Sequence, residues 1–246
     1  SWDAHVCQYL ALMQQRIRST PVRALSVVRR PSPVSRMLAL DLDSSLDLPE
    51  QRSLAHLRDR LQAEPFAATT GLVILTGRSL GQARQRYQEL HLPAPKAWIC
   101  RAGTEIHHAV DCSEDSAWAQ RISQAWDRDA VLAAMGQLQE HIKLQDLDHQ
   151  SRFKVSYLLR AFNGGLIGLA RQCLRRHGLQ AEPQLRCHWF LDVLPQRASR
   201  SEAIRFLAHS WGLPLERVLV VASQQGDGEL LDGLPATVLP ADHDPC

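Results

Sequence analysis

Three aspartates follow an apolar run in the segment MLALDLDSSLD, residues 37–47, at positions Asp41, Asp43 and Asp47. Residues two apart in a strand face the same side, so Asp41 and Asp43 would leave the end of a strand together. Two such carboxylates can divide a phosphoryl transfer: one attacks the phosphorus and becomes an aspartyl-phosphate, while the other protonates the leaving oxygen and then activates water. The alternative is a pair that only ends a strand and solvates its turn.

A calcium loop of the form D-x-D-x-[DNS] is another explanation for the same cluster. An EF-hand loop counted from Asp41 requires Gly at its sixth position and Glu at its twelfth, where this chain has Leu46 and Arg52. No helical pattern precedes the loop either. The spacing therefore favours a site at the end of a strand, where paired like charges call for a cation and Mg²⁺ suits the oxygen ligands.

Three further segments could complete a phosphate site. GLVILTGRS ends a second apolar strand in Thr76 and Gly77, whose hydroxyl and backbone N–H could hold phosphate oxygens at a helix start. In ASRSEA, Arg200 opens a helix and could neutralise phosphate. LVVASQQGDGELL is an apolar strand followed by a polar loop that contains Asp227.

The elements around these segments alternate between strand and helix. Strand patterns at 37–42, 71–77, 96–103 and 217–223 and helix patterns at 53–63, 79–90 and 199–212 predict an α/β fold with a parallel, helix-covered sheet. Between them the alternation stops: residues 115–126, 129–141 and 165–178 read as helices, and 153–159 and 186–194 as strands. A pattern that stops and restarts predicts an inserted cap domain. In the cap, Lys154 is the residue we expect to contact a ligand.

Composition narrows the classes of partner. The chain has 246 residues, with 28 Lys and Arg against 26 Asp and Glu, and its formal charge of +2 gives no support for binding to nucleic acid or to a membrane. The six cysteines form no C-x-x-C pair and no zinc-ligand spacing, which favours a reduced, cytoplasmic protein. No apolar run approaches the ~20 residues of a membrane span.

Taken in order, the four segments resemble the haloacid dehalogenase (HAD) superfamily and, within it, the sucrose-phosphate phosphatases. The resemblance rests on LDLDSSLD, LTGRSLGQAR, RAGTEIHH, AWDRDAVL, LQDLDHQSRFKVSYLL and LDVLPQRASRSEAIRFL. It implies a Rossmann-like HAD core with a parallel sheet and an inserted α/β cap of the C2 type. We expect the core at 37–105 and 186–246 and the cap at 106–185.

The resemblance also implies roles for single residues. Asp41 matches the nucleophile, Asp43 the acid/base and Thr76 the phosphate-binding hydroxyl, with Mg²⁺ as cofactor held by Asp41, Asp43 and Asp227. Two positions depart from the family pattern. Arg200 replaces a phosphate-clamping Lys, and Ser223 replaces the usual metal-binding acid. Loss of that acid should weaken Mg²⁺ binding and cut turnover by orders of magnitude.

The segment SWDAHVCQYL resembles the closing segment of the glycosyltransferase domain of sucrose-phosphate synthases, so residues 1–36 would be its tail and linker. The expected function is a sucrose-6-phosphate phosphatase-like domain that is weak or inactive as a hydrolase. It would bind sugar phosphate, stabilise the synthase or dock a separate phosphatase. The alternatives are an active Mg²⁺-dependent sucrose-6-phosphate phosphatase and a purely structural module without a ligand.

Overall fold

The computed structural model describes residues 34–43, 51–64, 66–161, 164–186, 189–221 and 236–238. The chain separates into residues 1–30 and 31–246, and every described residue belongs to the second unit. Residues 1–33 of the predicted transferase tail and linker, which was expected at 1–36, therefore lie outside the described residues. Ser223 and Asp227 lie outside them as well.

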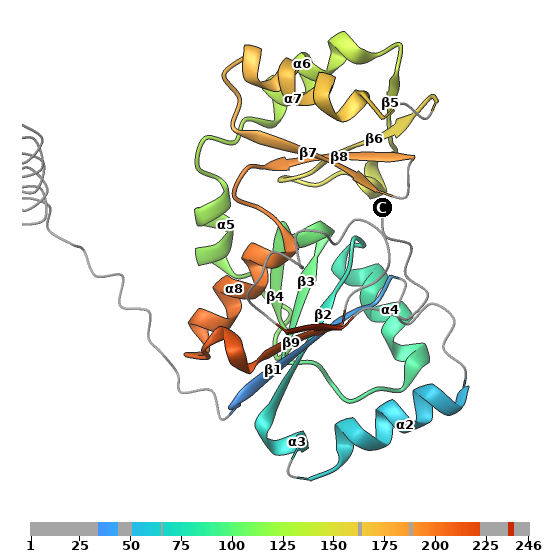
Figure 1. The fold of residues 1–246 in the computed structure, drawn as a ribbon, viewed down its shortest axis with the longest axis vertical. Helices are drawn as coiled ribbons and strands as arrows, with labels where there is room; N and C mark the ends of the chain where they lie inside the picture. Colours follow the sequence, from blue (N-terminus) through green and yellow to red (C-terminus); the bar gives the residue numbers. More distant parts are fainter. Residues whose placement is uncertain are drawn as a thin grey trace, which may run out of the picture. The chain divides into compact units, whose positions relative to one another are not determined.

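The larger sheet has the order β10-β9-β1-β2-β3-β4 (Figure 1). Its strands are β1 (Arg36–Asp41), β2 (Thr70–Leu75), β3 (Ala97–Cys100), β4 (Glu105–His108), β9 (Val218–Val221) and β10 (Ala236–Val238). All neighbours in it are parallel except β3 and β4. The prediction of a parallel sheet is confirmed, with one antiparallel strand added at an edge.

Helices cover both faces of this sheet, because its strands bury alternate residues on opposite sides. They are α2 (Gln51–Gln62), α3 (Phe66–Thr69), α4 (Leu80–Leu90), α5 (Ser116–Ile122) and α8 (Arg200–Ser210). In β1, Met37 and Ala39 pack with α5 and α8, whereas Leu38 and Leu40 pack with α2 and α4. Asp41 continues the first of these series, so it ends β1 on the side of α8.

The smaller sheet has the order β5-β6-β8-β7 and is antiparallel throughout. Its elements are β5 (Ile142–Leu144), β6 (Val155–Leu159), β7 (Ala181–Arg186) and β8 (Phe190–Pro195), with helices α6 (Arg128–Met135) and α7 (Leu166–Arg176). Both helices pack on one face of the sheet in a separate hydrophobic cluster (Figure 1). The other face carries polar residues such as Ser156 and Asp192, which are paired across β6 and β8. Four short 3₁₀ turns complete the described elements: Arg101–Gly103, Gly136–Leu138, Leu147–His149 and Leu215–Arg217.

The two sheets divide the chain differently from the predicted cap range of 106–185. Strand β4 belongs to the larger sheet, and strand β8, up to Pro195, belongs to the smaller one. The predicted single strand at 186–194 is instead the end of β7 followed by β8. The chain reverses between Arg186 and Phe190, and this hairpin keeps β8 in the cap because β8 pairs with β6 and β7. No described helix is long and apolar enough to span a bilayer.

Candidate functional site

The predicted site residues of β1 and β2 meet at the carboxyl edge of the larger sheet. Asp41 and Leu75 are partners in the parallel register, so Asp41 and Thr76 end neighbouring strands, and both side chains are fully buried. Asp43 lies two residues beyond Asp41 and donates its backbone N–H to Asp41 Oδ1 at 3.0 Å. Parallel strands present their carboxyl ends at one edge, which is where open α/β sheets hold ligands.

The carboxylate of Asp43 accepts hydrogen bonds from the turn after β2. Thr76 Oγ1 lies 2.7 Å from Asp43 Oδ1, and the Gly77 N–H donates to Asp43 Oδ2 at 2.5 Å. Arg78 Nε is 3.2 Å from Oδ1. Burial raises the pKa of Asp43, but the Arg200 guanidinium, the Gly77 N–H and the Thr76 hydroxyl outweigh it and hold that pKa below its ordinary value. Asp43 is therefore ionised at neutral pH.

Arg200 reaches both aspartates from the first turn of α8. Its Nη1 lies 3.6 Å from Asp41 Oδ2 and its Nη2 lies 3.5 Å from Asp43 Oδ2. Ser199 begins the helix by accepting a hydrogen bond from the Glu202 N–H at 3.1 Å. A planar guanidinium can span two carboxylates in this way, whereas a single ammonium is a point charge.

Gly103 allows α8 to begin this close to the sheet. Its φ of +94° lies in the left-handed region, and an added Cβ would lie 2.3 Å from the Ser199 carbonyl carbon and 2.5 Å from the Arg200 nitrogen. The Trp118 indole N–H in α5 donates to the Gly103 carbonyl oxygen at 3.1 Å. The turn after β3 therefore fixes the position from which Arg200 extends.

In the cap, Lys154 and Asp192 form a buried ion pair. Lys154 is 3% exposed and Asp192 is 1% exposed, and Lys154 Nζ lies 3.3 Å from Asp192 Oδ2. Ser156 Oγ donates to the other carboxylate oxygen. Burial raises the pKa of Asp192, but Lys154, Arg186 and the Ser156 hydroxyl together hold it below its ordinary value. Burial, together with the nearby guanidinium groups of Arg186 and Arg101, outweighs the Asp192 carboxylate and holds the pKa of Lys154 below its ordinary value.

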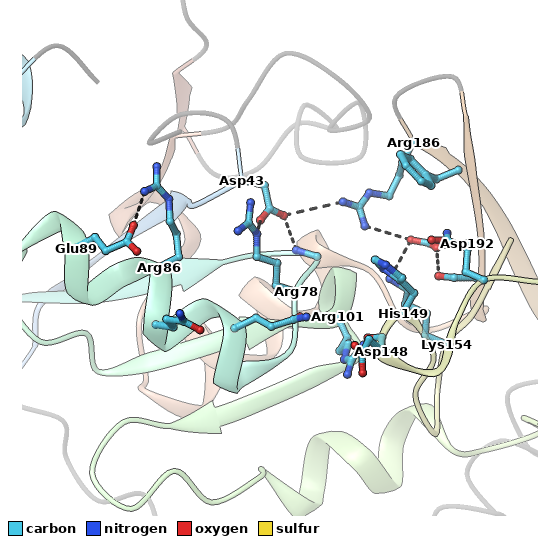
Figure 2. A pocket seen from close by; sticks show the side chains of 16 residues that line it. Asp43, Arg78, Arg86, Glu89, Arg101, Asp148, His149, Lys154, Arg186 and Asp192 are labelled. Atoms are coloured by element: carbon cyan, nitrogen blue, oxygen red, sulfur yellow. Dashed lines mark hydrogen bonds and ion pairs between the residues drawn. The ribbon is translucent and has the colours of Figure 1, made fainter. Parts of the chain in front are cut away.

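Arg186, the last residue of β7, joins the cap pair to the core site. Figure 2 shows its guanidinium between Asp192 and Asp43, with Nη1 3.2 Å from Asp192 Oδ2 and Nη2 4.0 Å from Asp43 Oδ2. The same group lies against the backbone of Gly77, where an added Cβ would be 2.4 Å from Nη1. Arg186 is not among the site residues that we predict from the sequence.

A cavity of about 580 Å³ lies between the carboxyl edge of the core and the polar face of the cap sheet. Its volume is in the range of sites for small organic ligands. It is lined from the core by Asp43, Gly77, Arg78, Gln82, Gln85, Arg86, Glu89 and Arg101, and from the cap by Gln145, Asp148, His149, Lys154, Ser156, Arg186, Phe190 and Asp192 (Figure 2). Most of the lining residues are of charged or polar type, which suits a polar, anionic ligand.

The structure thus brings Asp41, Asp43, Thr76, Gly77 and Arg200 into one cluster, and places Lys154 on the opposite wall of the cavity. A fully buried Lys–Asp pair in the cap was not expected, since Lys154 was predicted to contact ligand rather than protein. The strand through Asp192 was noted in the sequence, but the reach of Arg186 depends on a hairpin that carries no turn signature.

The described residues do not fit the expected magnesium site. Both carboxylates that would hold Mg²⁺, Asp41 and Asp43, already contact the guanidinium of Arg200. Within the described ranges, no group of three or more His, Cys, Asp or Glu side chains is arranged to hold a metal ion. The other expected ligand, Asp227, and its neighbour Ser223 lie outside those ranges.

Residues 34–246 match the model of the sucrose-6F-phosphate phosphohydrolase family. This chain belongs to that family. It is similar to the sucrose-phosphatase of Synechocystis sp. PCC6803, solved in complex with sucrose and phosphate, with a TM-score of 0.78 and 26% identity over 86% of this chain and 85% of the other. A haloacid dehalogenase-like hydrolase from Bacillus subtilis shares the fold, with a TM-score of 0.59 and 18% identity over 86% of this chain and 83% of the other. The HAD fold and its cap are therefore confirmed.

Longer relatives also match the chain. A Nitrosococcus oceani protein described as a HAD-like hydrolase is 29% identical over 219 residues, which cover 82% of this chain and 58% of that protein. A protein of Oryza sativa subsp. japonica described as a sucrose-phosphate synthase is 24% identical over 276 residues, which cover 97% of this chain and 28% of the synthase. The chain therefore spans little more than half of the first relative and just over a quarter of the second.

Proposed function

We propose that this chain is a sugar-phosphate-binding domain that hydrolyses its ligand slowly or not at all, and that it forms part of a sucrose-phosphate synthase. The family match and the sucrose-phosphatase likeness support sucrose 6F-phosphate as the ligand. The synthase relatives support a glycosyltransferase domain in the same polypeptide. In that setting the domain stabilises the synthase or docks a separate phosphatase.

The observation that carries the proposal is the state of the two aspartates. Hydrolysis requires Asp41 to attack phosphorus and Asp43 to donate a proton to the leaving sugar oxygen. A general acid works best when its pKa lies near the working pH. Instead, Arg200 holds both carboxylates, and the pKa of Asp43 is lowered, so that Asp43 is ionised and has no proton to give at neutral pH.

The second candidate is a working phosphatase with Asp41 as nucleophile. Its support is the placement of Asp41, Asp43 and Thr76 at one sheet edge, which is the arrangement that the reaction needs. Binding of a phosphate dianion would displace the present contacts of Asp43 and raise its pKa by like-charge repulsion. This candidate therefore predicts turnover that depends on Asp41.

The test compares phosphate release by the 246-residue chain from sucrose 6F-phosphate, with Mg²⁺ present, with release by Asp41→Asn. Asp59→Asn, at an exposed position on α2, is the matched control. We expect no release above the Asp41→Asn background, together with a rise in melting temperature on adding the sugar phosphate. Release at ~1 s⁻¹ or faster that is lost only in Asp41→Asn would establish the second candidate. The absence of both release and stabilisation would instead favour a structural module.

A further inference from the structure

The Asp43 carboxylate lies among donors that suit a phosphate group. Its two oxygens face a hydroxyl, a backbone N–H and three guanidinium groups, which belong to Thr76, Gly77, Arg78, Arg186 and Arg200. Guanidinium groups match the geometry of phosphate oxygens, and charge-assisted bonds of this kind are among the stronger polar contacts.

Among the described residues, the ion pairs around Asp43 form one connected network. Its cations are Arg78, Lys154, Arg186 and Arg200, and its carboxylates are Asp41, Asp43 and Asp192. The guanidinium of Arg200 contacts both Asp41 and Asp43, the two described carboxylates that would otherwise hold a divalent cation. The same guanidinium and that of Arg186 are the kind of donors that phosphate oxygens accept from.

We infer that this network binds the phosphate group of the ligand without a metal ion, that the phosphate takes the place of the Asp43 carboxylate, and that Arg186 supplies a phosphate contact from the cap. The inference rests on the proposed function and specifies how the same site holds its ligand. It assigns the neutralising role to arginine side chains of this chain.

Arg186 gives this binding mode a link between the domains. The residue belongs to the cap strand β7, yet its guanidinium lies against the Gly77 backbone and within 4.0 Å of Asp43 in the core. Asp192 Oδ2 holds the other side of the group at 3.2 Å. A phosphate at the Thr76 and Gly77 donors would therefore meet a cation that the cap already holds in place, and binding would favour the closed arrangement of cap and core.

Titration calorimetry of the 246-residue chain with sucrose 6F-phosphate and with inorganic phosphate tests the inference, in excess EDTA and in excess Mg²⁺. We expect the same affinity in both buffers. Arg186→Gln should lower the affinity for both ligands about 10-fold to 100-fold, which is the loss expected for a hydrogen bond to a charged group. The affinity of Arg186→Lys should lie between those of Arg186→Gln and the unmodified chain. Arg176→Gln, at an exposed position on α7, should bind as the unmodified chain does. Thermal melts of each variant establish that it is folded.

Asp43→Asn tests the displacement itself. The amide is nearly isosteric but carries no charge to compete for the arginines, so phosphate should bind about 10-fold more tightly, which corresponds to the removal of one like-charge repulsion. Weaker binding by Asp43→Asn, unchanged binding by Arg186→Gln, or sugar-phosphate binding that requires Mg²⁺ would each overturn the inference while leaving the proposed function standing. Metal-independent binding that depends on Arg186, accompanied by turnover that depends on Asp41, would uphold the inference and overturn the proposed function.

Discussion

Replacing Asp192 by Asn should destabilise the chain strongly at neutral pH. Asp192 is 1% exposed, and its carboxylate is the counter-ion of Lys154, which is 3% exposed. The variant leaves the ammonium buried without its partner. Breaking a buried pair by removing one member costs about 3–5 kcal/mol. In a chain of this size, about 2–4 °C of melting temperature corresponds to each kcal/mol, so the midpoint should fall by about 6–20 °C.

The pH dependence of this loss follows from the pKa of Asp192. Its folded-state pKa lies below the ordinary value, so the carboxylate contributes stability that is fully present above an unfolded-state pKa of about 3.9 and is lost as the pH falls through the folded-state pKa. The difference in free energy of unfolding between the unmodified chain and Asp192→Asn should therefore be largest at neutral pH and should become smaller in acid. Lys154 acts in the opposite sense at high pH: burial lowers its pKa, so deprotonation relieves the cost of the variant as the pH rises.

Urea unfolding followed by circular dichroism at several pH values measures this effect. Asp59→Asn is the exposed control, and its free energy of unfolding should stay within about 0.5 kcal/mol of that of the unmodified chain. The double variant Asp192→Asn with Lys154→Met should recover much of the loss, because removing both charges leaves no buried ion. A single variant as stable as the unmodified chain at pH 7 would refute the reasoning. So would a double variant that is less stable than the single one, since the buried ammonium would then not be the source of the cost.

Other substitutions probe the core. Ser223→Asp restores an acid to the position where the family places a metal ligand, so it should create a rise in melting temperature with added Mg²⁺; Ser223→Asn is the uncharged control. Gly103→Ala places a Cβ 2.3 Å from the Ser199 carbonyl carbon at a φ of +94°, so it should cost about 1–3 kcal/mol in urea unfolding and weaken phosphate binding by displacing Arg200. Ser79→Ala removes the capping box of α4 and should cost about 1 kcal/mol, whereas Ser79→Asp should retain most of it; equal losses in both would contradict the capping role.

The sequence predicted the core of the molecule well because its patterns there are local. The apolar runs of β1 and β2 and the helix begun by Ser79 lie within two residues of their predicted bounds. Parallel pairing then brings Asp41 and Thr76 together, because both follow a strand at the same edge. Arg200 could be placed for the same reason, since it opens the helix that packs on the face of the sheet to which Asp41 points.

The cap was less predictable because its site residues depend on a hairpin. Cys187, His188 and Trp189 follow β7, and none of them is a Gly, Asn, Asp or Pro that would mark a tight turn. The run through this point therefore read as one strand. Pro183 was the available signal: proline is confined to edge strands or bulges, and β7 is indeed at the edge of the smaller sheet. Recognising the hairpin would have placed Arg186 beside the strand that carries Asp192.

The two departures from the family pattern can be understood as one electrostatic change. The resemblance implies a site with a Lys where this chain has Arg200 and an acid where it has Ser223. Loss of the acid removes a negative charge that a divalent cation needs, and without that cation Asp41 and Asp43 would repel each other. The guanidinium of Arg200 contacts both carboxylates, at 3.6 Å and 3.5 Å. A single ammonium is a point charge and spans two carboxylates less well than a planar guanidinium does. On the proposed function, Arg200 would thus offset the repulsion that a metal would otherwise relieve, and the site would keep an affinity for anions without an acid at position 223.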